Sequence, residues 1–212
     1  MPNSSINRLF PTGQITNRAT GLTLLALLAL SMLATRYHHF SSVLHLADTS
    51  WAVFFLAGLW FRSTRVLFGL LAVAVLVDLG SVALDGAAMA SCFSPAYPGV
   101  LLAYAALWGA GRLAGKWLAV PRSATPSATL IGIGGIALAL TIGAAAAFII
   151  SNVTFYAFSG QFETMTAGEY TAVVAPYLLG YLSTAAGYTT LALVALAAFQ
   201  LLRESNWRHR HS

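Results

Sequence analysis

Charged residues are scarce in this chain. They make up 8% of its 212 residues, while 58% of the residues are hydrophobic and the mean hydropathy is +0.75. A water-soluble domain usually has about 25% charged residues, so too few are present here to cover a water-facing surface. The composition therefore excludes an ordinary soluble protein and predicts an integral membrane protein.

The short alternating runs of a membrane β-barrel are also missing. The apolar runs are about 17–25 residues long, the length of transmembrane helices, whereas barrel strands span about 10 residues. We therefore expect an all-α, polytopic protein with one transmembrane domain (19–202) between two short tails (1–18 and 203–212). The basic residues stand singly between apolar runs, so the net charge of +5 does not indicate a nucleic-acid partner.

Six apolar segments are expected to cross the membrane: 19–35, 49–61, 66–84, 97–111, 128–150 and one within 170–202. The second is short for a crossing, and the last is long enough to be tilted or kinked near Pro176. With six crossings both ends lie on one side, and that side holds every basic residue except Arg36. Because basic residues accumulate on the cytoplasmic side, we expect both termini in the cytoplasm and 151–169 as the longest outer connection.

Several catalytic and nucleotide-binding motifs do not occur in the sequence. There is no Walker A motif, no G-x-S-x-G and no H-E-x-x-H. The patterns that mark ATP hydrolysis, serine hydrolases and zinc peptidases are therefore missing. We expect no nucleotide cofactor, and active transport would draw its energy from a source other than ATP hydrolysis by this chain.

Cysteine occurs once, at Cys92, so an internal disulfide is excluded. Cys92 lies in the connection 85–97, on the expected outer side. Two interpretations stay open: an inert small residue, or a reactive thiolate that acts as a nucleophile or as a ligand for a soft metal. Loop-forming neighbours and Tyr97, five positions further on, favour a pocket around the thiol.

Asp78 is an acid inside an apolar segment, which is costly and indicates a functional site by default. It would face a water-filled outer cavity, or it would bond to a Ser, Thr or Tyr of another helix. His38, His39 and His45 precede the second segment. They do not have the spacing of a known zinc motif, and we interpret them as the rim of a polar cavity.

Aromatic residues are concentrated on the expected outer side. Trp51 begins the second segment, Phe155 and Tyr156 lie in the long outer connection, and Tyr177 and Tyr181 share one face of the last segment. Such residues form belts at membrane interfaces. They also form the walls of pockets for large, flat, partly apolar ligands.

Small residues recur at a spacing of four. Gly111 and Gly115 form one such pair, and Ser183 and Gly187 form another. Small residues at this spacing let the backbones of two membrane helices approach closely, so these positions predict a tightly packed bundle.

The order of these features resembles the BtuM family of cobalamin transporters, which are related to the substrate-binding (S) components of energy-coupling factor transporters. The shared pattern is D-x-S-W-A-V-F-F-L-A-G, an intramembrane Asp, C-x-x-x-A-Y and L-W-x-x-G-R, within residues 36–115. The matching residues are Asp48, Ser50 to Gly58, Asp78, Cys92, Ala96, Tyr97, Leu107, Trp108, Gly111 and Arg112.

The resemblance implies a six-helix, S-component-like bundle in the bacterial inner membrane that binds and takes up cobalamin. It implies that the Cys92 thiolate coordinates the cobalt and displaces an upper axial ligand such as cyanide, so that the protein also decyanates its ligand. Asp78, Tyr97 and His39 would be pocket residues. The outer aromatic side chains named above would form the walls.

Two other functions and the question of a partner stay open. The chain would alternatively be a membrane enzyme that depends on the Cys92 thiol, or an accessory subunit in which Cys92 is inert.

S components typically dock on an energising module through small residues at four-residue spacing in the first helix. Ala26, Ala29 and Ala34 here do not have that spacing, which favours a protein that acts alone over one that needs the module.

Overall fold

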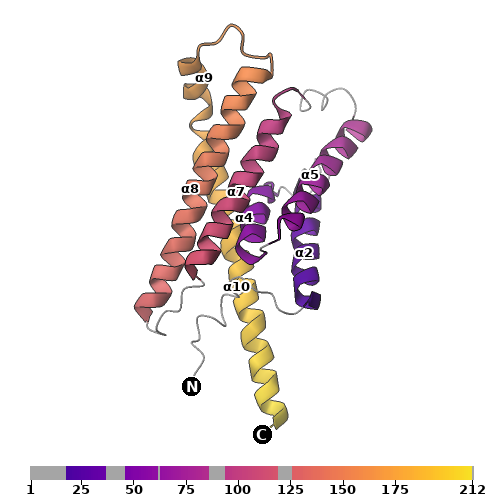
Figure 1. Cartoon of the computed structure of the whole chain (residues 1–212), viewed down its shortest axis with the longest axis vertical. Coiled ribbons are helices and arrows are strands. Elements are labelled where there is room, and N and C mark those ends of the chain that lie inside the picture. Colours follow the sequence, from indigo (N-terminus) through magenta and orange to yellow (C-terminus); the bar gives the residue numbers. More distant parts are fainter. Residues whose placement is uncertain (1–17, 37–45, 62, 86–93, 119–125, 212) are drawn as a thin grey trace.

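The computed structural model describes residues 18–36, 46–61, 63–85, 94–118 and 126–211. Their regular structure is entirely α-helical (Figure 1). The helices are α2 (Arg18–Arg36), α4 (Ser50–Trp60), α5 (Thr64–Asp85), α7 (Tyr97–Leu118), α8 (Pro126–Phe158), α9 (Ala167–Val174) and α10 (Tyr177–His211).

The expectation of a helical membrane protein is confirmed. Four helices are long and apolar enough to cross a membrane: α2, α5, α8 and α10. The 22-residue α7 carries Arg112 and Lys116 near its end, and α4 has only 11 residues. A crossing needs about 20 apolar residues, so the expected second segment forms a helix of about half that length.

The prediction of a connection over 151–169 is wrong for its first half, because α8 continues to Phe158. Polar side chains there bond to carbonyls of their own helix: Asn152 Nδ2 donates to Phe148 O at 2.9 Å, and Thr154 Oγ1 to Ile150 O at 2.8 Å. Such local bonds allow polar residues to continue a helix instead of ending it. The chain turns only at Gly160, whose positive φ of 71° suits glycine.

The kink expected near Pro176 is confirmed as a break between α9 and α10. Thr166 and Glu169 form a capping box that starts α9, and the helix ends at Val174 before the proline. α10 then runs to His211, so the expected C-terminal tail is helical up to that residue. Figure 1 shows α9 at one end of the molecule and the end of α10 at the other.

α4 is the centre of the bundle. All of its 11 residues are buried, which fits a sequence that is apolar all round. Figure 1 shows it between α7 on one side and α2 and α5 on the other. The helices α2, α5, α7, α8 and α10, all of which contribute to the site described below, contact this short, enclosed helix.

α4 and α7 pack backbone against backbone at glycines. A Cβ added to Gly58 would lie 2.0 Å from the carbonyl oxygen of Trp108, and one added to Gly111 would lie 2.0 Å from that of Phe55. Gly115 likewise approaches Leu59. The close packing predicted for Gly111 and Gly115 is confirmed, whereas Gly187 faces open space and makes no such contact.

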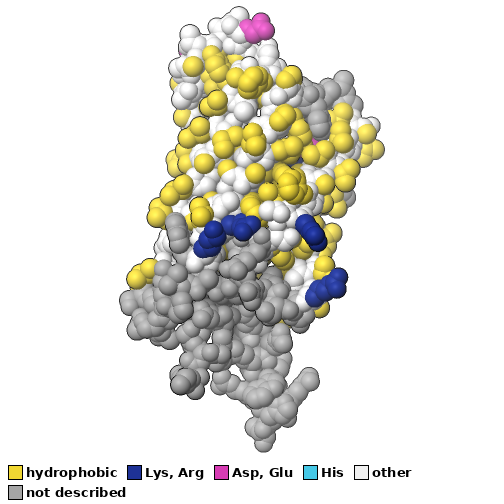
Figure 2. All heavy atoms as spheres, viewed as in Figure 1, with side chains coloured by type: hydrophobic (Ala, Val, Ile, Leu, Met, Phe, Trp, Pro, Cys, Tyr) yellow, Lys and Arg dark blue, Asp and Glu magenta, His cyan; other side chains and the backbone are white. Residues whose placement is uncertain are grey.

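The described charges lie toward opposite ends of an apolar surface. Figure 2 shows Lys and Arg side chains gathered in a band at one end of the yellow surface and an acidic side chain at the far end. Glu163 and Glu169 belong to the turn after α8 and to α9, at that acidic end. Three charged residues lie at neither end but line the same cavity inside the bundle: Arg36, Asp48 and Asp78.

Candidate functional site

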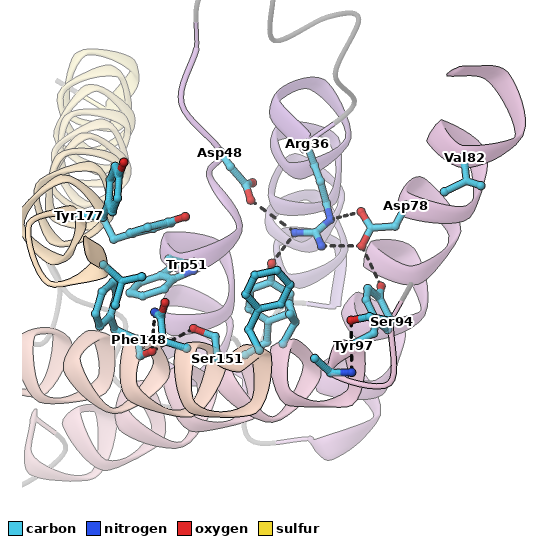
Figure 3. A pocket seen from close by; sticks show the side chains of 17 residues that line it. Arg36, Asp48, Trp51, Asp78, Val82, Ser94, Tyr97, Phe148, Ser151 and Tyr177 are labelled. Atoms are coloured by element: carbon cyan, nitrogen blue, oxygen red, sulfur yellow. Dashed lines mark hydrogen bonds and ion pairs between the residues drawn. The ribbon is translucent and has the colours of Figure 1, made fainter. Parts of the chain in front are cut away.

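An open cavity of about 520 Å³, the main cavity, lies among the helices that surround α4 (Figure 3). Pockets for small ligands usually have volumes of about 300–1,000 Å³. Six of the pocket residues expected from the sequence line it: Trp51, Asp78, Tyr97, Phe155, Tyr177 and Tyr181. The cavity therefore brings together residues from α4, α5, α7 and α8 that are far apart in the chain.

Arg36 is the centre of the polar side of the main cavity. Its Nε and Nη2 donate to Oδ1 and Oδ2 of Asp78, each at 2.6 Å. Only 11% of the Arg36 side chain and 17% of the Asp78 side chain are exposed. A two-point bond of this kind is strong and directional, and it fastens the end of α2 to α5.

The same guanidinium reaches a second carboxylate. Nη1 of Arg36 lies 3.4 Å from Asp48 Oδ2 and donates to Ser50 Oγ at 3.1 Å and to the Tyr104 hydroxyl. Asp48 Oδ1 accepts from the Ser50 backbone N–H at 2.9 Å and from its hydroxyl at 2.6 Å. Among the described residues, one cation thus faces two carboxylates in this cluster.

Tyr97 completes the surroundings of Asp78. Its hydroxyl donates to Asp78 Oδ2 at 2.8 Å. Asp78 therefore lines a cavity and also bonds to a tyrosine of another helix, one of the two partners expected for it. A turn starts α7 at this place, with the Tyr97 N–H donating to Ser94 O at 2.9 Å. Ser94 itself lines the main cavity.

Aromatic rings form the opposite wall. Trp51 stacks on Tyr181 with ring centroids 4.9 Å apart, and Phe148 lies 6.1 Å from Tyr181. Tyr177 and Phe155 also line the cavity. A ligand in this space would meet flat apolar surface on one side and the charged cluster on the other.

Tyr156 lies outside the lining of the main cavity. Its hydroxyl donates to Met165 O at 2.8 Å, and its ring packs 5.0 Å from that of Tyr170. Tyr170 in turn donates to Asn152 Oδ1 at 3.0 Å, and burial raises its pKa. These contacts hold α9 on the end of α8.

Cys92 and His39 lie outside the described residues. Cys92 stands two positions before Ser94 in the sequence. Within the part of the chain that the structure describes, no three His, Cys, Asp or Glu side chains are grouped closely enough to hold a metal ion.

The sequence did not point to Arg36, Tyr104 or Phe148. Arg36 was visible only as the single basic residue on the wrong side of the charge pattern. A lone cation and a lone intramembrane acid are complementary in charge, but nothing in the sequence shows that the two side chains meet. Tyr104 and Phe148 lie within apolar runs, where the sequence does not distinguish lining residues from core residues.

A scan against models of protein families finds no match for this chain, and a search of curated protein sequences finds none either.

Proposed function

We propose that this protein binds a corrinoid from the outer side of the bacterial inner membrane and carries it inward, as the BtuM resemblance implies. The observation that carries the proposal is the main cavity, which joins an aromatic wall to a cluster of charged and hydroxyl groups. Its lining residue Ser94 follows Cys92 by two positions. Because two residues of chain span at most about 7 Å, the chain length allows Cys92 to meet a ligand held there.

The lining has the chemistry that a corrinoid requires. The macrocycle is large and flat, and it would lie against Trp51 and Phe155. Its peripheral amides would exchange hydrogen bonds with groups such as Asp78 and the Tyr97 hydroxyl. Mixed linings of this kind, mostly apolar with a few placed polar groups, are usual for organic ligands.

The cobalt of the ligand is bound by Cys92 in this proposal. The thiol loses its proton, the sulfur forms a bond to Co(III), and the cobalt–cyanide bond breaks. Cyanide leaves with the bonding electron pair and takes up a proton as hydrogen cyanide, so the oxidation state of cobalt does not change. Thiolate is a soft ligand suited to such an exchange, and the protein is primarily a transporter that also decyanates its cargo.

The proposed topology has six membrane segments, formed by α2, α4, α5, α7, α8 and α10, with both termini in the cytoplasm. It is supported by the charge separation of Figure 2, in which the basic band would face the cytoplasm. The ligand would enter from the side of α9. Release to the inside would require the helices to rearrange, with or without an energising module.

The visible spectrum of the purified protein with cyanocobalamin tests this proposal. We expect a thiolate–cobalt band in the wild-type protein, loss of that band in Cys92→Ser, and its retention in the control variant Ser63→Ala, whose exposed side chain does not line the main cavity. An unchanged spectrum in Cys92→Ser would refute the ligand role of the thiol. Failure of the wild type to retain any corrinoid would refute the function itself.

A growth assay separates transport from an accessory role. In cells that depend on this protein for scarce cobalamin, Cys92→Ala should slow growth, and Ser63→Ala, outside the main cavity, should not. Equal growth of the Cys92→Ala cells and the wild-type cells would leave the thiol without a part in uptake.

A further inference from the structure

A second cavity of about 350 Å³, the side cavity, adjoins the main cavity. Asp48, Trp51, Tyr177 and Tyr181 line both. The side cavity lies between the start of α10 and the segment before α4. Tyr188 of α10 donates to Ala47 O at 3.1 Å and holds that segment in place.

Asp48 gives the side cavity a negative charge. Among the described residues, no other carboxylate and no Lys, Arg or His lines it. Arg36 lines only the main cavity, and it lies closer to Asp78, at 2.6 Å, than to Asp48, at 3.4 Å. The Asp48 side chain is 41% exposed, so part of its carboxylate is accessible to a further donor.

The rest of the side-cavity wall is aromatic. Trp51 and Tyr181 stack with their centroids 4.9 Å apart, and Tyr177 is 62% exposed. Figure 3 shows Asp48 with Trp51 and Tyr177 on one side and Arg36 on the other. The faces of aromatic rings are electron-rich and attract cations, ammonium groups in particular.

We propose that the side cavity binds an organic ammonium group, held by the Asp48 carboxylate and by the rings of Trp51, Tyr177 and Tyr181. The carboxylate supplies the counter-charge that Arg36 only partly balances, and the rings replace the water around the cation. This proposal does not depend on the corrinoid proposal, although the two cavities share four lining residues. The same ammonium chemistry occurs in free amines and in choline or ethanolamine lipid headgroups.

The test uses the full-length protein in non-ionic detergent. Isothermal titration with choline chloride and with ethanolamine covers the free ligands. Native mass spectrometry after addition of phosphatidylethanolamine or phosphatidylglycerol covers the lipids. We expect saturable binding of an ammonium probe and a preference for phosphatidylethanolamine over phosphatidylglycerol if the source is a lipid.

The variants separate charge from ring contacts. Asp48→Asn keeps an oxygen for the Ser50 N–H and removes the charge, so it should weaken binding about tenfold or more, as loss of a charged hydrogen-bond partner does. The matched control Glu163→Gln removes an outer acid that does not line either cavity, and it should leave binding unchanged. Tyr177→Phe should retain binding, and Tyr177→Leu should weaken it about threefold or more, in line with loss of a cation–ring contact.

Two results would overturn the proposal. One is equal affinity in the wild type and Asp48→Asn, and the other is no saturable binding of any ammonium probe to the wild type. If Asp48→Asn does not fold, as judged by gel filtration, the Tyr177 pair decides, because that exposed ring is not needed for packing. Corrinoid binding, read from the visible spectrum of the same samples, is scored separately, so failure of either proposal is distinguishable.

Discussion

Arg36 and Asp78 form a two-point ion pair across 42 positions of the sequence, with both bonds at 2.6 Å. The pair joins the last residue of α2 to the second half of α5. Tyr97 of α7 adds a third bond to the same carboxylate. Three helices are thus tied together at the wall of the main cavity, so the pair contributes both to stability and to the shape of the site.

Removing one partner of this pair should destabilise the protein strongly. Arg36→Gln leaves Asp78 as an unbalanced, largely buried charge, and such losses cost about 3–5 kcal/mol. Thermal unfolding in detergent measures the effect. Arg65→Gln, which removes an exposed arginine at the start of α5, serves as the matched control and should change stability little.

The double variant Arg36→Met/Asp78→Leu separates pairing from simple loss of charge. Because it removes both charges together, it should be clearly more stable than Arg36→Gln. A double variant that is as unstable as the sum of the single ones would mean that the two side chains are not coupled.

The sequence predicted the polar half of the site only where a residue was unusual by itself. Asp78 could be found because an acid within an apolar run is costly, and Tyr97 because it followed the lone cysteine. Arg36 could not be paired with Asp78, since hydrophobic periodicity does not tell which helices are neighbours. Helix order in space is decided by contacts such as Gly58 against Trp108, between residues 50 positions apart.

At the end of α8, the sequence predicted a connection where the structure has a helix. Ser151, Asn152 and Thr154 are residues that favour loops in isolation, and they predicted a connection. In the structure each bonds to a carbonyl one turn earlier, and these local bonds let the helix continue to Phe158. The cavity gains Phe155 and Asn152 as lining residues from this extra helical length.

Gly58→Ala should disrupt the packing of α4 on α7. The added Cβ would lie 2.0 Å from the Trp108 carbonyl oxygen, which belongs to the backbone and cannot rotate away. Overpacking of a core costs about 1–3 kcal/mol or more. We expect a lower unfolding temperature or a loss of monodisperse protein on gel filtration.

Gly69→Ala is the control for that change. Gly69 is also helical, but a Cβ there meets nothing within 4 Å. Alanine should stabilise that position by about 0.5–1 kcal/mol through its better helix propensity. Equal effects of the two substitutions would contradict the close contact at Gly58.

The start of α9 should weaken in acid. The backbone N–H of Thr166 donates to Glu169 Oε2 at 2.8 Å, and the Thr166 hydroxyl donates to the same oxygen at 2.7 Å. These two bonds lower the pKa of Glu169. A carboxyl whose pKa is lowered in the folded state contributes stability above its unfolded pKa of about 4.3. That contribution is lost as the pH falls through the folded value.

Hydrogen exchange across α9, corrected for intrinsic rates, measures this loss between neutral pH and about pH 3. Protection should fall with acid in the wild type and in Glu163→Gln, whose residue is not part of the capping box. In Glu169→Gln protection should be lower at neutral pH and should change less with acid. A wild-type profile that is flat over this range would show that the capping box does not stabilise α9.

The two ends of α8 should be reached from opposite sides of the membrane, because the apolar stretch Leu130–Phe158 between them is long enough to cross it. Cys92→Ala provides a background without cysteine, in which Gln161→Cys marks the turn before α9 and Lys116→Cys marks the end of α7. Both positions are exposed.

If the basic band faces the cytoplasm, a membrane-impermeant maleimide should label Gln161→Cys in intact cells and Lys116→Cys only after permeabilisation. The reverse pattern would place the mouth of the main cavity in the cytoplasm, and uptake from outside would then be refuted even if the protein bound a corrinoid.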